Sequence, residues 1–399
     1  MDQTTYNRMA LLKKNRVCIA LAALIATLAG CSKEDASKIL DRINSLKQIA
    51  HVQDVTAQTG KFVINPQFEW AGDFSEGYAD VLVGDWLTGK WGYIDKQGRM
   101  AVEATLGSNG KFAEGLAAVR TGNEVKWGYI DHQGQTIVTP QFDDTKPYSD
   151  GLAAVRIGDE TSGKWGYIDR HGKMVVSPQF NAVRIHTEGL AAVRVGDDKS
   201  GKWGYIDKQG TMAINPQFNA AYVFREGLAP VRIGDAQSGK WAYIDPQGKI
   251  VINPQFDAGS GFKDGLAAVR VGDEKSGTWG HIDKQGKVVI NPQFGYAGLF
   301  SEGLAVVRIG DDKTGKWGYV DQQGRMIINP QFDAATSFKE GLAAVRVGDE
   351  KTGKWGYIDK QGAMVVNPQF DHARLFSDGL AAVRIGDASS GRWGYIARR

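Results

Sequence analysis

The sequence predicts an all-β protein in which one small antiparallel sheet is repeated nine times along the chain. Three observations lead to this fold class. The dipeptide Trp-Gly recurs at an almost constant spacing, the residues between copies alternate as short strands do, and both faces of the resulting sheet are apolar. A sheet that is apolar on both faces must be covered by its neighbours, so we expect the copies to stack.

The register of the repeat is set by nine tryptophans. The first step between them is 36 residues and the seven others are 38 residues, and only the fifth copy lacks the glycine, with Ala242 in its place. We expect these side chains to be structural core residues, because large aromatics on stacked sheets are usually buried. The alternative is that their faces stack on sugar rings. The series is Trp91, Trp127, Trp165, Trp203, Trp241, Trp279, Trp317, Trp355 and Trp393.

A typical copy, residues 341–378, divides into strands. Alternation predicts three of them, at Leu342–Val347, Lys354–Asp359 and Met364–Asn367, and Pro368 is expected to end the third because it has no N–H to donate. These strands run up, down and up. The stretch Phe370–Phe376 must therefore run down as a short fourth strand before the next copy starts, which makes an antiparallel four-stranded unit.

Stacked units of this kind form either a closed β-propeller-like ring or an open superhelical array. The array begins with a third strand (Phe62–Asn65) and ends with a second strand (Trp393–Ile396), so pairing the two ends would complete the ninth unit. Pro230 lies in a first strand, which suits the free inner edge of a propeller blade. Both features favour the ring, whereas nine blades exceed the usual four to eight, and the open array remains the alternative.

The first thirty residues have the layout of a cleaved export signal. Lys13, Lys14 and Arg16 precede an apolar run, residues 17–28, that is short for a membrane span. Either Met1 or Met9 is the true start. Without residues 1–30 the chain holds 44 basic and 44 acidic residues. A neutral surface argues against nucleic acid as a partner.

The end of this segment, Leu28-Ala29-Gly30-Cys31, resembles the lipobox of bacterial lipoproteins. The resemblance implies that Cys31 becomes the mature N-terminus, carries acyl chains such as palmitate and attaches the protein to a membrane. Ser32 in the next position implies the outer membrane of a Gram-negative bacterium. The alternative is an ordinary signal peptide with a chance cysteine. We thus expect a signal peptide at 1–30, a segment at 31–60 with an amphipathic helix at Ser37–Val55, which is either a spacer or a cap, and a repeat domain at 61–399.

The repeated strings GLAAVR, KWGYID and NPQF resemble the WG-repeat (KWG-repeat) family of bacterial proteins over about residues 60–399. The copy around Val102–Leu106 departs most from this pattern, because Glu103-Ala104-Thr105-Leu106 replaces Asn-Pro-Gln-Phe and puts its turn into the fourth strand in doubt. The resemblance implies a β-repeat architecture and brings no catalytic residues with it.

Candidate ligand-binding residues come from one repeated position and one exception. An arginine recurs at the end of the first strand, with Leu82 in the first copy, and a ring would gather these side chains in a basic circle suited to carboxylates or phosphates. The alternative is that each arginine pairs with a repeated acid of the neighbouring unit and rests on Trp. Trp86 lies outside the Trp-Gly register and is a candidate exposed aromatic. The arginines are Arg120, Arg156, Arg194, Arg232, Arg270, Arg308, Arg346 and Arg384.

Catalytic, cofactor and metal motifs are not found in the sequence. The six histidines share no repeat position, and Gly310–Lys316 imitates a phosphate-binding loop but is followed by Trp where Ser or Thr is required. Pairs such as Asp311-Asp312 lack the alternating oxygen spacing of a dedicated calcium site. We therefore expect no enzyme, no cofactor and no metal.

The function expected from these features is a lipid-anchored, non-catalytic binding scaffold of the cell envelope, which presents a multivalent surface to an unknown envelope protein or glycan. The alternative is a purely structural envelope or surface component without a specific ligand.

Overall fold

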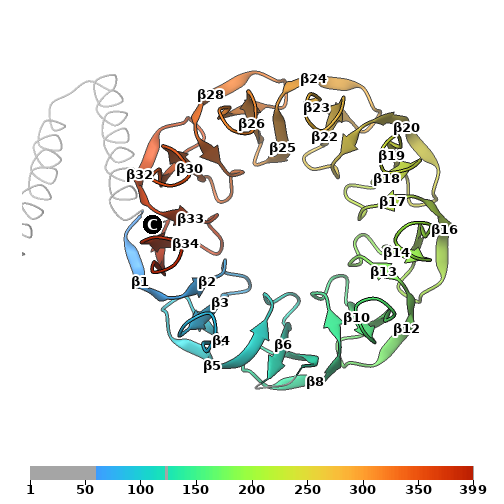
Figure 1. Cartoon of the computed structure of the whole chain (residues 1–399), viewed down its shortest axis with the longest axis horizontal. Helices are drawn as coiled ribbons and strands as arrows, with labels where there is room; N and C mark the ends of the chain where they lie inside the picture. Colours follow the sequence, from blue (N-terminus) through green and yellow to red (C-terminus); the bar gives the residue numbers. More distant parts are fainter. Residues whose placement is uncertain (1–59, 122–124, 399) are drawn as a thin grey trace, which may run out of the picture. The chain divides into compact units, whose positions relative to one another are not determined.

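The computed structural model describes residues 60–121 and 125–398, and they form a closed ring of nine four-stranded antiparallel blades (Figure 1). These residues contain no helix, and so none that could cross a membrane. The export signal, Cys31 and the helix expected at Ser37–Val55 lie outside the described residues. The all-β repeat fold is confirmed, and the described part of the chain is a ring, as opposed to an open array.

Each blade is ordered from the axis outwards as inner, second, third and outer strand. The inner strands are β2 (Trp70–Ala71), β9 (Asp144–Thr145), β13 (Ala182–Val183), β17 (Ala220–Ala221), β21 (Ala258–Gly259), β25 (Tyr296–Ser301), β29 (Ala334–Ala335) and β33 (His372–Ala373). The second strands are β3 (Tyr78–Val83), β6 (Ala117–Thr121), β10 (Ala153–Ile157), β14 (Ala191–Val195), β18 (Ala229–Ile233), β22 (Leu266–Val271), β26 (Leu304–Ile309), β30 (Ala343–Val347) and β34 (Leu380–Ile385).

The third strands carry the Trp-Gly dipeptide: β4 (Lys90–Asp95), β7 (Trp127–Ile130), β11 (Lys164–Ile168), β15 (Lys202–Ile206), β19 (Lys240–Ile244), β23 (Thr278–Asp283), β27 (Lys316–Asp321), β31 (Lys354–Ile358) and β35 (Arg392–Ala397). The outer strands are β1 (Phe62–Phe68), β5 (Met100–Asn109), β8 (Thr136–Phe142), β12 (Met174–Phe180), β16 (Met212–Phe218), β20 (Ile250–Phe256), β24 (Val288–Phe294), β28 (Met326–Phe332) and β32 (Met364–Phe370). We number the blades 1 to 9 from the one containing β3 to the one containing β35.

The short fourth strand forms, but in a different place from the one expected. In the stretch Phe370–Phe376 only His372–Ala373 is a strand, and it pairs with β34 of the following copy. The chain must return from the outer edge to the axis, so this strand starts the next blade. The predicted first strand is therefore the second from the axis. In the first copy, where Glu103–Leu106 breaks the pattern, β5 runs on from blade 1 into blade 2 and serves both.

Pro230 is accommodated because its backbone nitrogen is not required by the sheet. It lies in β18, between β17 and β19, and not at the free inner edge that was expected. In blades 6 and 8 the equivalent N–H groups, of Ala268 and Ala344, donate to the side-chain hydroxyls of Ser260 and Thr336 at 2.9 and 3.0 Å. The two-residue inner strand has already ended at this level, so a proline breaks no ladder bond.

The prediction that Pro368 ends the third strand is wrong. This strand, β32, is the outermost of its blade and continues to Phe370, with a register shift between the pairs Tyr357–Val366 and Trp355–Phe370. An edge strand tolerates a proline at a bulge. The bulge also explains the glycine of Trp-Gly, because a Cβ at Gly356 would lie 2.3 Å from the carbonyl oxygen of Val366.

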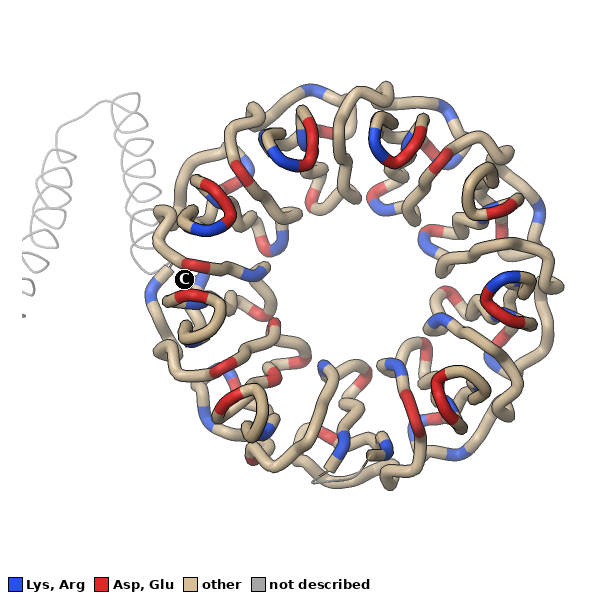
Figure 2. Tube along the Cα trace, viewed as in Figure 1, with Lys and Arg blue, Asp and Glu red and all other residues tan. Residues whose placement is uncertain are grey.

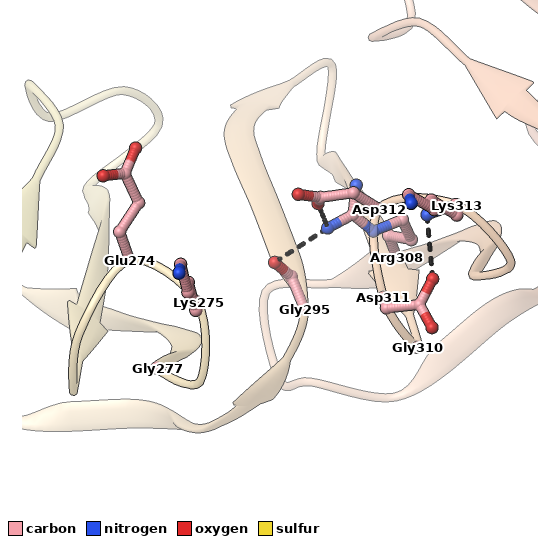
Figure 3. A pocket seen from close by; sticks show the side chains of 9 residues that line it. All are labelled: Glu274, Lys275, Gly277, Gly295, Arg308, Gly310, Asp311, Asp312 and Lys313. Carbon is pink, nitrogen blue, oxygen red and sulfur yellow. Dashed lines mark hydrogen bonds and ion pairs between the residues drawn. The ribbon is translucent and has the colours of Figure 1, made fainter.

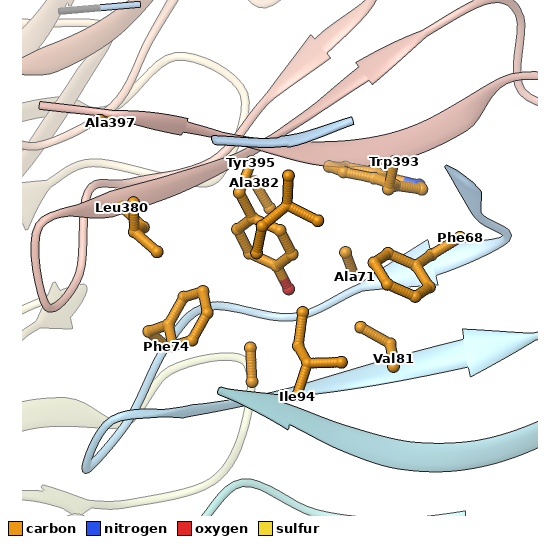
Figure 4. Close-up of a cluster of buried hydrophobic side chains, with 12 residues drawn as sticks. Phe68, Ala71, Phe74, Val81, Ile94, Leu380, Ala382, Trp393, Tyr395 and Ala397 are labelled. Carbon is orange, nitrogen blue, oxygen red and sulfur yellow. The ribbon is translucent and has the colours of Figure 1, made fainter. Parts of the chain in front are cut away.

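The ring closes through the two ends of the repeat domain, as the sequence predicted. Strand β1 pairs with β35 through Phe62–Ile396, Ile64–Tyr395 and Phe68–Trp393. The side chains of both ends then share one apolar cluster with those of blade 1 (Figure 4). Burying large apolar side chains on both sides of this junction contributes about 1.5–3 kcal/mol each. The seam is therefore packed like the other blade interfaces.

Two rims bound the ring. The turn rim carries the two-residue turns between inner and second strands, and the loop rim carries the loops between second and third strands. In all nine turns an acidic residue has φ between 53° and 56°, which is unusual for a residue with a side chain. In eight turns its carboxylate accepts the N–H of the turn glycine in the next blade at 2.8–3.0 Å, and Asp378 closes the circle on Gly77.

Candidate functional site

The arginine series lies at the loop rim and is half-buried. Seven of the eight guanidinium groups lie over the Trp ring of their own blade, with the central carbon 4.6–5.9 Å from the ring centre. The exception is Arg232, and in its blade Tyr222 stacks on Trp241 with the ring centres 5.1 Å apart. Each arginine is the cross-strand neighbour of its tryptophan, as in the pair Arg156–Trp165. Cation–π packing within a blade is therefore the main contact of this series.

Ion pairs are formed by only some of these arginines. Arg194 and Arg308 pair with Asp198 and Asp312 of their own loops, and Arg156 lies 3.8 Å from Asp144. Asp198 and Asp312 belong to the same repeat unit as their arginines, so among the described residues of this series only Arg156 pairs with an acid of the neighbouring unit. Figure 2 shows basic and acidic residues interspersed around the ring. A uniform basic circle is absent from the described residues.

The repeated tryptophans are largely packed in the interfaces between blades. Trp165, Trp241 and Trp393 are 9%, 8% and 3% exposed, and the others are half-buried. Trp86, in the loop between β3 and β4, is 57% exposed and packs edge-on against Trp70 with ring centres 5.8 Å apart. The two kinds of tryptophan thus differ in their access to a ligand.

Aligning the nine copies identifies positions that the sequence analysis did not single out. The first and third residues counted from the start of the inner strand differ between copies while the surrounding blade stays constant. The first inner position is Trp70, Ser108, Asp144, Ala182, Ala220, Ala258, Tyr296, Ala334 or His372. The third inner position, two residues later, is Gly72, Gly110, Lys146, Arg184, Tyr222, Ser260, Gly298, Thr336 or Arg374. The signal that could have found them is variation within a fixed repeat.

A buried hydrogen bond fixes the backbone at the third inner position. In eight blades a buried tyrosine of the third strand donates its hydroxyl to the carbonyl of that residue in the next blade, at 2.6–3.0 Å. In blade 6 His281 replaces the tyrosine and its Nε2 lies 2.9 Å from the Gly298 oxygen. Burial raises the pKa of these tyrosines, so the hydroxyls stay protonated donors. The contact uses only the backbone, which leaves the side chain free to differ.

The varying side chains build an aromatic arc across blades 8, 9 and 1. Its consecutive ring centres are 5.3–6.4 Å apart. Arg374 lies over two of its members, 4.3 Å from the centre of the Trp70 ring and 5.1 Å from that of Trp393. We call this set the aromatic arc; it consists of Trp355, His372, Trp393, Trp70, Trp86 and Trp91.

Smaller groupings occur elsewhere around the ring. Tyr296 lies between Trp279 and Trp317 at 6.1 and 5.2 Å. A hollow of about 370 Å³ is lined by Tyr222, Gly259 and Leu299 among others. Different sectors of the inner surface therefore present different chemistry.

A second hollow, of about 280 Å³, lies between the loops of blades 6 and 7 (Figure 3). It contains the pair Asp311-Asp312. Asp311 accepts the N–H groups of Lys313 and Thr314 at 2.8 and 2.7 Å, and Asp312 pairs with Arg308. Hydrogen bonding to its own loop lowers the pKa of Asp311. These carboxylates are used within the loop, and no cluster of metal-binding side chains is found among the described residues.

The described histidines are dispersed. His186 and His281 are fully buried, His132 lies 3.0 Å from Glu76 at the turn rim, and His372 belongs to the aromatic arc. Cys31 lies outside the described residues.

Comparison with known proteins gives the family. A model described as WG containing repeat matches nine segments: residues 58–85, 91–124, 127–160, 165–199, 203–241, 241–274, 279–313, 317–350 and 355–387. No curated protein matches the sequence.

Solved structures resemble the chain in fold alone. One described as a eukaryotic initiation factor has a TM-score of 0.54 and 12% identity, covering 75% of this chain and 89% of that one. Prolyl oligopeptidase B from Galerina marginata has a TM-score of 0.44 and 12% identity, with 92% and 60% covered. The β-propeller domain of the trilobed protease from Pyrococcus furiosus has a TM-score of 0.38 and 8% identity, with 77% and 98% covered. With repeat matches over most of its length, the chain belongs to the family built from the WG-containing repeat.

Proposed function

We propose that this protein is a non-catalytic binding scaffold of the cell envelope and that its inner strands form the binding surface. One observation carries the proposal. A hydrogen bond from the neighbouring blade fixes the backbone carbonyl of the residue at the third inner position. The side chain at that position ranges from glycine to arginine and tyrosine. A fixed backbone with varied side chains is suited to recognition, because the scaffold tolerates changes in specificity. The partner is an envelope protein or a glycan.

We also propose that the scaffold is anchored through acyl chains on Cys31 in the outer membrane of a Gram-negative bacterium. The support is the sequence Leu28-Ala29-Gly30-Cys31 followed by Ser32. Two or more acyl chains give stable attachment to a bilayer. Labelling cells with an alkyne analogue of palmitate tests this: we expect the label on the wild-type chain and none on Cys31→Ala. Label retained by that variant would contradict the anchor.

The non-catalytic role rests on the chemistry of the repeat. An active site needs unlike reactive groups that converge, whereas the body of the described blades repeats like groups at equal intervals. His186 is fully buried, which keeps its imidazole from touching a substrate.

Capture of partners from an envelope extract tests the binding role. The full-length chain is compared with a triple variant, Tyr296→Ala, Arg184→Thr and His372→Ala, whose new residues all occur at the same positions of other copies. We expect saturable capture by the wild type, loss of at least part of it in the variant, and unchanged thermal unfolding. Identical saturable recovery by both would place the binding surface outside the inner strands, and none by either would support the structural alternative.

A further inference from the structure

The aromatic arc is found in only one sector of the ring. Four blades, blade 8 among them, have alanine at the first inner position, where no aromatic ring connects a tryptophan to that of the preceding blade: Ala182, Ala220, Ala258 and Ala334. In the arc, His372 and Trp70 fill this position and connect the tryptophans of blades 8, 9 and 1. The most exposed ring of the arc is that of Trp86, whereas Trp393 is buried. The arc therefore offers an exposed aromatic ring with half-buried rings, among them Trp70, beside it.

Two of the three loops of this sector lack the acid that pairs with arginine in blades 4 and 7. In blades 4 and 7 the residue after the loop aspartate is Asp198 or Asp312, and it pairs with the arginine of its blade. In blade 9 the same position is Ala388. Blade 8 keeps Glu350 at this position, and blade 5, outside the sector, has Ala236. In blade 1 both members of the ion pair are replaced. Leu82 occupies the position of the arginine, and Trp86 occupies the position of the acid. Aromatic surface takes the place of an internal ion pair.

The arginines at the arc form no short ion pair among the described residues, and Asp333, Asp349 and Asp371 act on Arg346 and Arg384 only at longer range. Arg346, Arg374 and Arg384 have no carboxylate within 4.0 Å among the described residues, and a buried Nε of each lacks a hydrogen-bond acceptor. Burial and, after it, the charges of these three arginines lower the pKa of His372 to about 4. Asp80 interacts electrostatically with Arg374 but makes no ion pair with it. The carboxylates of a ligand would accept hydrogen bonds from these guanidinium groups.

From this arrangement we infer that the aromatic arc binds an acidic saccharide, with sugar rings on Trp70 and Trp86 and carboxylates on Arg374 and Arg384; this rests on the proposed binding function. The C–H groups on the face of a sugar ring carry partial positive charge and pack on the negative face of an aromatic ring. Guanidinium groups bind carboxylates through two parallel hydrogen bonds. The alternation of flat and charged groups in the arc matches that of a uronic acid chain.

Binding of an oligogalacturonate to the full-length chain tests the inference. The titration follows tryptophan fluorescence and heat, with a neutral glucose oligomer of equal length and a short polyglutamate for comparison. We expect binding of the oligogalacturonate that weakens with salt and is at least tenfold tighter than that of either comparison ligand.

Variants locate the site. Trp86→Ala and Arg374→Ser are expected to weaken binding at least tenfold, and Arg374→Ser places at this position the residue found at Ser260. The matched control is Arg232→Leu, on the opposite part of the ring, which copies Leu82 and should leave binding unchanged. All variants must keep the wild-type unfolding temperature.

Each other outcome overturns the inference in a distinct way. Equal affinity for the neutral oligomer or for polyglutamate would rule out an acidic saccharide as the preferred class, and binding that survives both arc variants would place the ligand elsewhere. If the oligogalacturonate does not bind while envelope partners are still captured, this inference fails and the proposed function stands. If neither binds, both fail.

Discussion

The body of the blades keeps the same residues from copy to copy, whereas two positions of the inner strands vary. In the body, the same tyrosine, tryptophan, glycine and acidic turn recur and are bound to the neighbouring blade by hydrogen bonds and buried surface. On the inner strands, the first and third positions vary while their backbone stays in place. A residue that is repeated because its neighbour requires it is structural. A residue that is free to vary on the same backbone is where recognition can develop.

Truncating a repeated core side chain at the seam should have the largest effect. Phe68 is 5% exposed and lies where β1 closes the ring against Trp393. We expect Phe68→Ala to lower the free energy of unfolding by about 3–5 kcal/mol because it leaves a cavity. Chemical denaturation measures the loss. Phe256→Ala, at the same position inside blade 5, is the control for core loss away from the seam, and a loss below about 1 kcal/mol for Phe68→Ala would mean that the seam is not packed as the structure shows.

Adding one methyl group to the body should cost less. At Gly356 an alanine Cβ would lie 2.3 Å from the Val366 oxygen, so the bulged outer strand must move. We expect Gly356→Ala to cost about 1–3 kcal/mol by overpacking. Blade 5 already contains Ala242 at this position, so Ala242→Gly should be neutral or stabilising in the same denaturation experiment. Equal destabilisation by both changes would contradict this explanation.

Two histidines inside the body should make the fold sensitive to acid. His186 takes the place of Phe224, and His281 that of Tyr243, and burial lowers the pKa of both imidazoles. The unfolded chain then binds protons more readily, so their contribution to stability is complete above the ordinary histidine pKa and falls as the pH drops below it. We expect the double variant His186→Phe and His281→Tyr to lose less stability between pH 7.5 and pH 5.5 than the wild type. Parallel stability curves would show that these histidines do not titrate on unfolding.

Changing an inner position should have the smallest effect on stability. Tyr296 is 39% exposed, and four other copies have alanine at its position. We expect Tyr296→Ala to change the free energy of unfolding by less than about 0.5 kcal/mol, as for a surface substitution. Trp317→Ala, which removes the tryptophan packed beside it, should cost about 3–5 kcal/mol. A large loss from Tyr296→Ala would assign the inner strand to the structural part of the molecule.

The repeat itself was readable from the sequence because its signals are local. The Trp-Gly spacing fixed the unit, alternation located the second and third strands, and the unpaired ends at Phe62 and Trp393 predicted the closure. Trp86 could be singled out because it departs from a regular pattern.

The tertiary structure decided which blade each strand belongs to and what each repeated group contacts. The inner strand has two residues in most blades, and its pairing with the following copy depends on the chain returning to the axis. Pro368 lies within a strand because that strand is an edge. The sequence by itself thus determined the unit, its number and the joining of its ends, since these follow from periodicity. The meeting of Arg374 with Trp70, 304 positions apart in the chain, needed the closed ring, because only stacking of blade 9 on blade 1 brings them together.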